Sequence, residues 1–237
     1  MSAVAASAAT ALDLIAHADP ELVRTVALSF MVSGTACFAA AWLGGPAGAW
    51  LAAAQFPGRR ALLLVLDTLL ALPSVVAGLV VYLLLSRSGP LGSWGILFTP
   101  TAMVIAQTIL VLPVVAALAR QVVADGLAEG GEQLRALGAG PAMRAALMLV
   151  HARWAVVTLL LVAFGRAVSE VGAVMIVGGN IAGVTRVMTT SIALETSKGD
   201  LPLALALGLV LLSLVALLNV VVALVPRSPG LAGATWR

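Results

Sequence analysis

Charged side chains are scarce in this sequence. Only 10% of its 237 residues are charged, whereas 62% are hydrophobic. A soluble domain has roughly 45–50% apolar and about 25% charged residues. No stretch of the ~100–150 residues that an ordinary soluble domain occupies lacks a long apolar run. The composition therefore predicts a polytopic membrane protein and excludes a large soluble domain.

The residue types that most catalytic and metal sites need are nearly absent as well. Cys37 is the only cysteine, so no intrachain disulfide can form. The histidines, His17 and His151, fall outside the apolar runs, and there is no H-E-x-x-H motif or cysteine cluster to hold a metal. The phosphate-binding motif G-x-x-x-x-G-K-[ST] is also missing. We therefore predict no catalytic residue, no metal ligand, and no ATP hydrolysis through that motif.

Five apolar runs are long enough to cross a membrane, since a helical span needs about 20 apolar residues. The first run exceeds one straight crossing, and Gly44-Gly45-Pro46 are expected to kink it near one end. Residues 3–18 precede it and are expected to form a short helix on the membrane surface. The five expected spans are 22–54, 61–85, 98–119, 154–176 and 201–225.

Positive charges are distributed unevenly between the two sides of these spans. If the loop after the first span is cytoplasmic, eight arginines lie inside and four Lys or Arg residues lie outside, with Arg166 inside a span and not counted. Cytoplasmic loops carry an excess of Lys and Arg, so the N-terminus is predicted outside and the C-terminus inside. Segment 120–153 is then the largest cytoplasmic loop. The inside residues are Arg59, Arg60, Arg120, Arg135, Arg144, Arg153, Arg227 and Arg237, and the outside residues are Arg24, Arg87, Arg186 and Lys198.

Segment 120–153 has the pattern of an amphipathic helical hairpin. Leucines recur on one helical face, with charged residues around them. Gly138 stands where a left-handed residue ends a helix, and Pro141 can begin the next one. We expect a hairpin that lies along the membrane, with a bare glycine corner where the backbone of a partner can approach closely. The alternative is a surface helix that merely connects two spans.

Three stretches resemble a known family. In "EQLRALGAGPAMR", Glu132 is followed six residues later by Gly138, which resembles the EAA loop of ABC-importer permeases, the coupling helix that sits in a cleft of the cytoplasmic ATPase. Residues 165–212, with "SEVGAVMIVGGNIAGVTRVMTT", and residues 70–92 resemble the permeases for tetrahedral oxyanions and are most similar to the tungstate-specific members. The resemblance covers nearly the whole chain.

The resemblance assigns contact with the ATPase to one short part of the hairpin. The sequence departs from the family's loop at two places. Gln133-Leu134 stands in place of two alanines, and His151-Ala152-Arg153 stands in place of the Leu-Pro ending of many members. The coupling assignment therefore depends also on the oxyanion-permease stretch that follows. The implied coupling residues are Glu132, Arg135, Ala136, Leu137, Gly138, Ala139, Gly140 and Pro141.

The resemblance implies an all-α integral membrane protein with five transmembrane helices and the type I ABC importer (MetI-like) permease fold, with residues 1–237 as a single transmembrane domain. It implies a homodimer of permeases, two cytoplasmic ABC ATPase subunits that bind ATP and Mg, and a periplasmic or extracellular oxyanion-binding protein. The permease would be no enzyme, would hold no cofactor and would bind no nucleic acid, in the lipid of a bacterial or archaeal cell membrane. Molybdate or sulfate is the alternative substrate, and a secondary transporter that needs no ATPase is the alternative of another class.

Two opposite charges fall inside the fourth expected span. Arg166 and Glu170 are four residues apart, so they share one face of a helix. Because a charge within the bilayer costs several kcal/mol, one interpretation is an ion pair that only fixes packing. The other is that Arg166 faces the transport path and assists a dianion, while Glu170 tempers its field. The neutral candidates for the path are Asn180, Thr189 and Thr190.

Overall fold

A computed structural model describes residues 3–17 and 19–224, and this part of the chain is helical, without strands. Residue 18 of the expected surface helix, the end of the fifth span at Val225, and the counted charges Arg227 and Arg237 lie outside the described residues. The elements are α1 (Ala3–Ala16), α2 (Pro20–Ala53), α3 (Arg59–Leu70), α4 (Ser74–Leu85), the 3-10 helix η1 (Gly92–Trp94), α5 (Pro100–Ala136), α6 (Pro141–His151), α7 (Arg153–Val168), α8 (Gly172–Gly178), α9 (Met188–Lys198) and α10 (Leu201–Ala223).

Three helices of the described chain, α2, α5 and α10, are each long and apolar enough to cross a membrane alone. Two further pairs pass the same test only together, α3 with α4 and α6 with α7, so the described part holds up to five spans. The second expected span, over 61–85, consists of two helices, because α3 and α4 meet at a bend of 99°. Pro73 stands at this bend, where proline removes a backbone donor and forces the preceding residue out of helical geometry.

The third and fourth expected spans also differ from their predicted bounds. α5 does not end near residue 119; it is 37 residues long in total and runs to Ala136. At about 1.5 Å per residue it is roughly 55 Å long, which exceeds a hydrocarbon core of about 30 Å. The first arm of the hairpin is therefore the end of α5 projecting from the span, not a separate helix along the membrane. The fourth span, expected over 154–176, is interrupted after α7 and resumes as α8.

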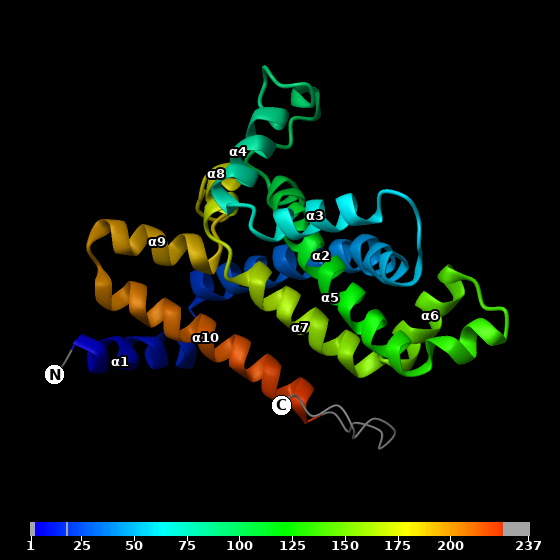
Figure 1. Ribbon diagram of the computed structural model, residues 1–237. Helices are drawn as coiled ribbons and strands as arrows, with labels where there is room; N and C mark the ends of the chain where they lie inside the picture. Colours follow the sequence, from blue (N-terminus) through cyan, green and yellow to red (C-terminus); the bar gives the residue numbers. More distant parts are fainter. Residues whose placement is uncertain (1–2, 18, 225–237) are drawn as a thin grey trace.

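The long helices α2 and α5 form the central pair of the molecule (Figure 1). Asp19 caps α2 by accepting the backbone N–H groups of Glu21 and Leu22, and α2 stays one helix through Pro46. A Cβ atom at Gly48 would overlap the Ala116 carbonyl of α5, so only glycine permits this approach. α7 packs against the same pair.

Two hydrophobic clusters lie beside the α2–α5 pair. Apolar residues of α4, α5 and α8 enclose one of them, with Met103 fully buried. The other joins α1, α9 and α10 around Met188 and Leu207. The helix expected over 3–18 is present as α1, and it lies along α10 in Figure 1 with Ala11 buried and Leu12 exposed. Its packing on α10 places α1 within the helical assembly.

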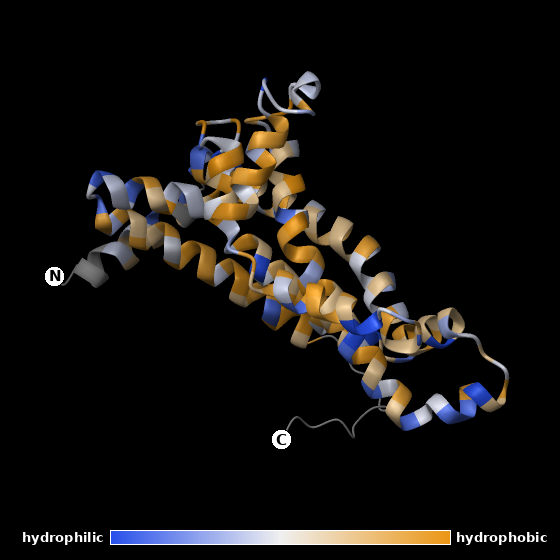
Figure 2. Cartoon of the chain, turned by 45° about the horizontal axis from the view of Figure 1, so that its top comes forward, coloured by the Kyte–Doolittle hydropathy of each residue, from blue (hydrophilic) through white to orange (hydrophobic). Residues whose placement is uncertain are grey.

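Much of the apolar surface has no protein cover. Figure 2 shows hydrophobic residues on nearly all of the long helices, and hydrophilic residues gathered toward the α5–α6 hairpin and the opposite end. α3 has no buried residue, and α4 exposes Val75, Leu79 and Leu83. Lipid or another subunit must cover such surfaces, because contiguous apolar patches of this extent are not left in water. The chain is a multi-pass membrane protein.

Candidate functional site

The α5–α6 hairpin ends in a glycine corner. The Gly138 N–H donates to the Arg135 carbonyl at 2.9 Å and the Ala139 N–H donates to the Leu134 carbonyl at 2.9 Å, which closes the last turn of α5. Gly138 has a φ of +77°, and Pro141 is the first residue of α6. The predicted left-handed residue and the predicted helix start are therefore confirmed. Both follow from local backbone sterics, which glycine relieves and proline preorganises.

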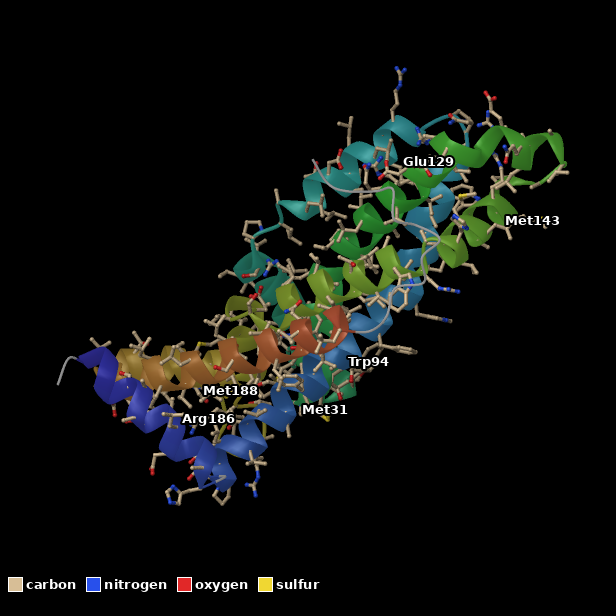
Figure 3. The ribbon with its side chains drawn as sticks, turned by 90° about the horizontal axis from the view of Figure 1, so that it is seen from below. Met31, Trp94, Glu129, Met143, Arg186 and Met188 are labelled. Carbon is tan, nitrogen blue, oxygen red and sulfur yellow. The ribbon has the colours of Figure 1, made fainter. Side chains whose placement is uncertain are left out.

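The corner is open to a partner. Of the eight predicted coupling residues, all but the half-buried Ala139 are exposed, and no atom lies within 4 Å of where a Gly138 Cβ would stand. Leu137 is 83% exposed and Met143 is 60% exposed, so large apolar side chains surround the corner. A cavity of about 360 Å³ between the hairpin arms is lined by charged residues that include Glu129, Glu132 and Arg144. Figure 3 shows Glu129 and Met143 together at this end of the molecule.

One buried arginine fastens α6 to the rest of the molecule. Arg144 is only 8% exposed, and its guanidinium NH2 group donates to the Ala53 carbonyl at 3.1 Å. Arg59 Nε donates to the nearby Leu51 carbonyl at 3.0 Å. Both cations therefore serve the C-terminal carbonyls of α2, where the helix dipole favours positive charge. The sequence predicted Arg144 only as a cytoplasmic charge, although its position among apolar residues of α6 was a signal for a buried contact.

A second polar centre lies where α7 stops and α8 begins. Arg166 NH1 donates to Glu170 Oε2 at 3.0 Å, so the predicted contact is confirmed, but across an interruption and not along a continuous helix. The Ala173 N–H donates to Glu170 Oε1 at 3.2 Å, and Thr189 Oγ1 donates to the Glu170 carbonyl at 2.8 Å. Glu170 is 5% exposed while Arg166 is 44% exposed. The carboxylate thus accepts from the first turn of α8, and the guanidinium paired with it is partly exposed at the surface of this chain.

Gln107 of α5 braces the same interruption, and sequence reasoning missed it. Its Nε2 donates to the Ala167 carbonyl at 3.0 Å, one of the last carbonyls of α7. The side chain is buried, and its Oε1 has no hydrogen-bond partner among the described residues. The signal was available, because Gln107 is the one amide within the third expected span, which otherwise holds apolar residues and three threonines. A buried amide in a span requires a polar partner.

The neutral path candidates separate in the structure. Thr189 reaches the Arg166–Glu170 centre through its bond to the Glu170 carbonyl. Thr190 is fully buried and instead exchanges hydrogen bonds with the Val187 backbone at the start of α9. Asn180 sits in the turn after α8 with a φ of +50°. The structure therefore brings together Arg166, Glu170 and Thr189, and leaves Asn180 and Thr190 outside this centre.

No group of three His, Cys, Asp or Glu side chains suited to a metal ion occurs in residues 3–17 and 19–224. The polar groups of the two centres can donate or accept hydrogen bonds and carry charge. A membrane protein that conducts ions uses such groups along its path.

Comparisons with known proteins find relatives that align over most of the chain. The chain is 42% identical over 222 residues to the tungstate uptake system permease protein TupB of Peptoclostridium acidaminophilum, covering 94% of this chain and 97% of that protein. It is 42% identical to a probable anion ABC transporter permease protein of Haloferax volcanii, covering 90% of this chain and 94% of the relative. TupB of Campylobacter jejuni is 39% identical over 70% of this chain and 69% of its own length. No protein-family model matches the chain.

Proposed function

The chain belongs to the family of ABC-transporter permeases for oxyanions, and on that premise we propose that it forms the membrane path through which tungstate is imported. The names of two relatives that align over most of their length support tungstate as the substrate. Molybdate or sulfate is the alternative, because all three are tetrahedral dianions. An oxyanion-binding protein outside the membrane would deliver the anion to the permease.

The exposed hairpin corner is the observation that carries the proposed mechanism. A separate ATPase subunit docks on residues 132–141, where the left-handed Gly138 leaves open space and Leu137 offers an apolar contact. Arg144 then transmits the movement of α6 to the C-terminal end of α2. ATP and Mg are bound by that ATPase, so this subunit is no enzyme and needs no cofactor.

A second copy of the chain completes the path. α3 has no buried residue, and it carries Asp67 among exposed leucines. A carboxylate on a lipid-facing helix would cost several kcal/mol, so this helix faces a partner subunit or a water-filled path. A C2 dimer with two ATPase subunits satisfies that requirement, since symmetric dimers bury one patch against its own copy. Each copy has five spans in this proposal, with its N-terminus outside and its C-terminus inside.

The interruption between α7 and α8 is the proposed gate region of each path. Non-helical backbone at membrane depth is tolerated where it is buried in protein or lines a cavity. Here Gln107, Glu170 and Thr189 satisfy the freed backbone groups. Arg166 is the only cation of this centre, and it is half-exposed. It supplies positive potential to a passing dianion, and Glu170 prevents the centre from holding that dianion too tightly.

The test is uptake into proteoliposomes that contain the permease and its ATPase. ATP is enclosed, and tungstate with its binding protein is added outside. We expect ATP-dependent uptake that stops when an ATPase-inactive subunit is substituted. Competition by unlabelled molybdate and sulfate ranks the three substrates. Uptake by the permease without any ATPase would refute the ABC mechanism and favour secondary transport.

A further inference from the structure

A second charged cavity lies far from the coupling hairpin. It measures about 420 Å³ and is enclosed by the first turns of α2 and the turn before α9. Figure 3 places Arg186, which lines it, at the opposite end of the molecule from Glu129 and Met143. None of the residues predicted for the transport path lines this cavity. The charged lining residues are Glu21, Arg24 and Arg186.

Both arginines of this cavity have side-chain N–H donors that make no hydrogen bond within the described chain. Arg186 NH1 donates to Glu21 Oε1 at 3.1 Å, while its Nε is buried and has no hydrogen-bond partner among the described residues. The Arg24 side chain forms no hydrogen bond or ion pair within the described chain. A Cβ atom at Gly183 would lie 3.7 Å from Arg24 NH1, so this guanidinium reaches across to the turn that carries Arg186. Two cations thus share one cavity with a single carboxylate.

The walls of the cavity are held in place by buried hydrogen bonds. The Ile181 carbonyl accepts the backbone N–H groups of Thr185 at 2.9 Å and Arg186 at 3.0 Å, which fixes the turn. The Met188 N–H donates to Ser29 Oγ at 2.8 Å, which ties the start of α9 to α2. The two arginines therefore come from elements that are already locked together, and binding requires little ordering of the backbone.

We propose that this cavity is an entry site for a divalent tetrahedral oxyanion, bound by Arg24 and Arg186. This inference rests on the proposed function, which supplies the orientation and the substrate class. Guanidinium groups suit oxyanions because their planar forks donate two parallel hydrogen bonds. Two of them balance the charge of a dianion. Glu21 is 70% exposed and competes with the anion for Arg186, so that the site can release what it binds.

Equilibrium binding of labelled tungstate to the assembled permease–ATPase complex tests the site, without binding protein and with the nucleotide sites filled. We expect Arg24→Gln to weaken binding about tenfold, through loss of charge-assisted hydrogen bonds. Glu21→Gln should strengthen binding several-fold, because it removes the competitor. Arg87→Gln, which neutralises an exposed arginine in the loop after α4, is the matched control and should change binding less than twofold.

The opposite signs distinguish an anion site from a structural ion pair, because loss of a structural pair in Glu21→Gln would not tighten tungstate binding. Tungstate binding that is insensitive to both substitutions, or no saturable binding by the wild-type complex, would overturn the inference. So would an Arg24→Gln variant that binds tungstate normally but loses stimulation of ATP hydrolysis by the binding protein, since the cavity would then be a docking contact. If the wild-type complex imports no oxyanion, the proposed function fails. Normal wild-type import with insensitive variants refutes only the entry site.

Discussion

Removing Arg166 and removing Glu170 should have unequal costs, because only one of them is buried. Arg166→Leu leaves the buried Glu170 carboxylate without its cation, and breaking a buried ion pair in this way costs about 3–5 kcal/mol. The low end applies, since the guanidinium is 44% exposed and water already screens part of the pair. Glu170→Leu removes the buried charge itself and leaves the buried Ala173 N–H without an acceptor, which costs about 1–3 kcal/mol. We therefore expect about 3 kcal/mol for the first change and about 1–3 kcal/mol for the second.

The double variant should resemble Glu170→Leu alone. Once the carboxylate is gone, the half-exposed Arg166 has no partner to lose, so its removal adds little. The magnitude of the coupling energy between the two sites is then about 3 kcal/mol, the cost of Arg166→Leu alone, because that cost disappears once Glu170 is also gone. Glu170→Gln should be milder than Glu170→Leu, because an amide oxygen can still accept from the Ala173 N–H.

The assay is thermal inactivation of the purified permease–ATPase complex, followed as the fraction still folded after heating at fixed temperatures. Membrane complexes unfold irreversibly, so the order of the variants is the result, not an absolute free energy. The expected loss is largest for Arg166→Leu and smaller for Glu170→Leu and the double variant, which should match each other. Equal losses for the single variants, or strictly additive losses, would refute this account of the α7–α8 interruption.

Uptake by the same double variant separates the two roles of Arg166. If the pair only fixes packing, the Leu/Leu variant keeps a substantial fraction of tungstate uptake at equal expression. If Arg166 assists the dianion, uptake falls to near background while the dimer and basal ATP hydrolysis stay normal.

Gly138→Glu should abolish ATP-driven uptake without preventing membrane insertion, because the new side chain fits within the permease but would clash with a docked ATPase. Gly138→Ala isolates the cost of the left-handed backbone, about 1 kcal/mol, and should retain much of the uptake. In a variant without the native cysteine, a cysteine at Ala139 should react with impermeant reagents only from the cytoplasm and one at Lys198 only from outside, and the reverse labelling would overturn the proposed orientation. Gly48→Ala should destabilise the complex by about 1–3 kcal/mol because it forces α2 from α5, whereas Gly45→Ala meets no atom within 4 Å and should be neutral in the same thermal assay.

The class of protein and the start and end of individual helices could be predicted from the amino-acid sequence alone. Apolar runs of about 20 residues specify spans because each residue adds its own transfer free energy, whatever the neighbouring helices do. Gly138 and Pro141 fixed the hairpin corner for a similar reason, since their effect on the backbone is intrinsic. The contact between Arg166 and Glu170 was equally local, because it spans only one turn.

The positions at which the spans are interrupted, and the contacts between polar residues distant in sequence, are known only from the tertiary structure. A hydropathy average over a window of residues contains no information on the direction of the helix axis. It could therefore not show that α3 and α4 bend by 99° or that α7 stops before Glu170. The interruption at Glu170 persists because Gln107 and Thr189, distant in sequence, satisfy its backbone. Arg144 likewise found its acceptor on α2. A buried polar group needs a partner wherever the fold supplies one, and that position is set by packing, not by sequence distance.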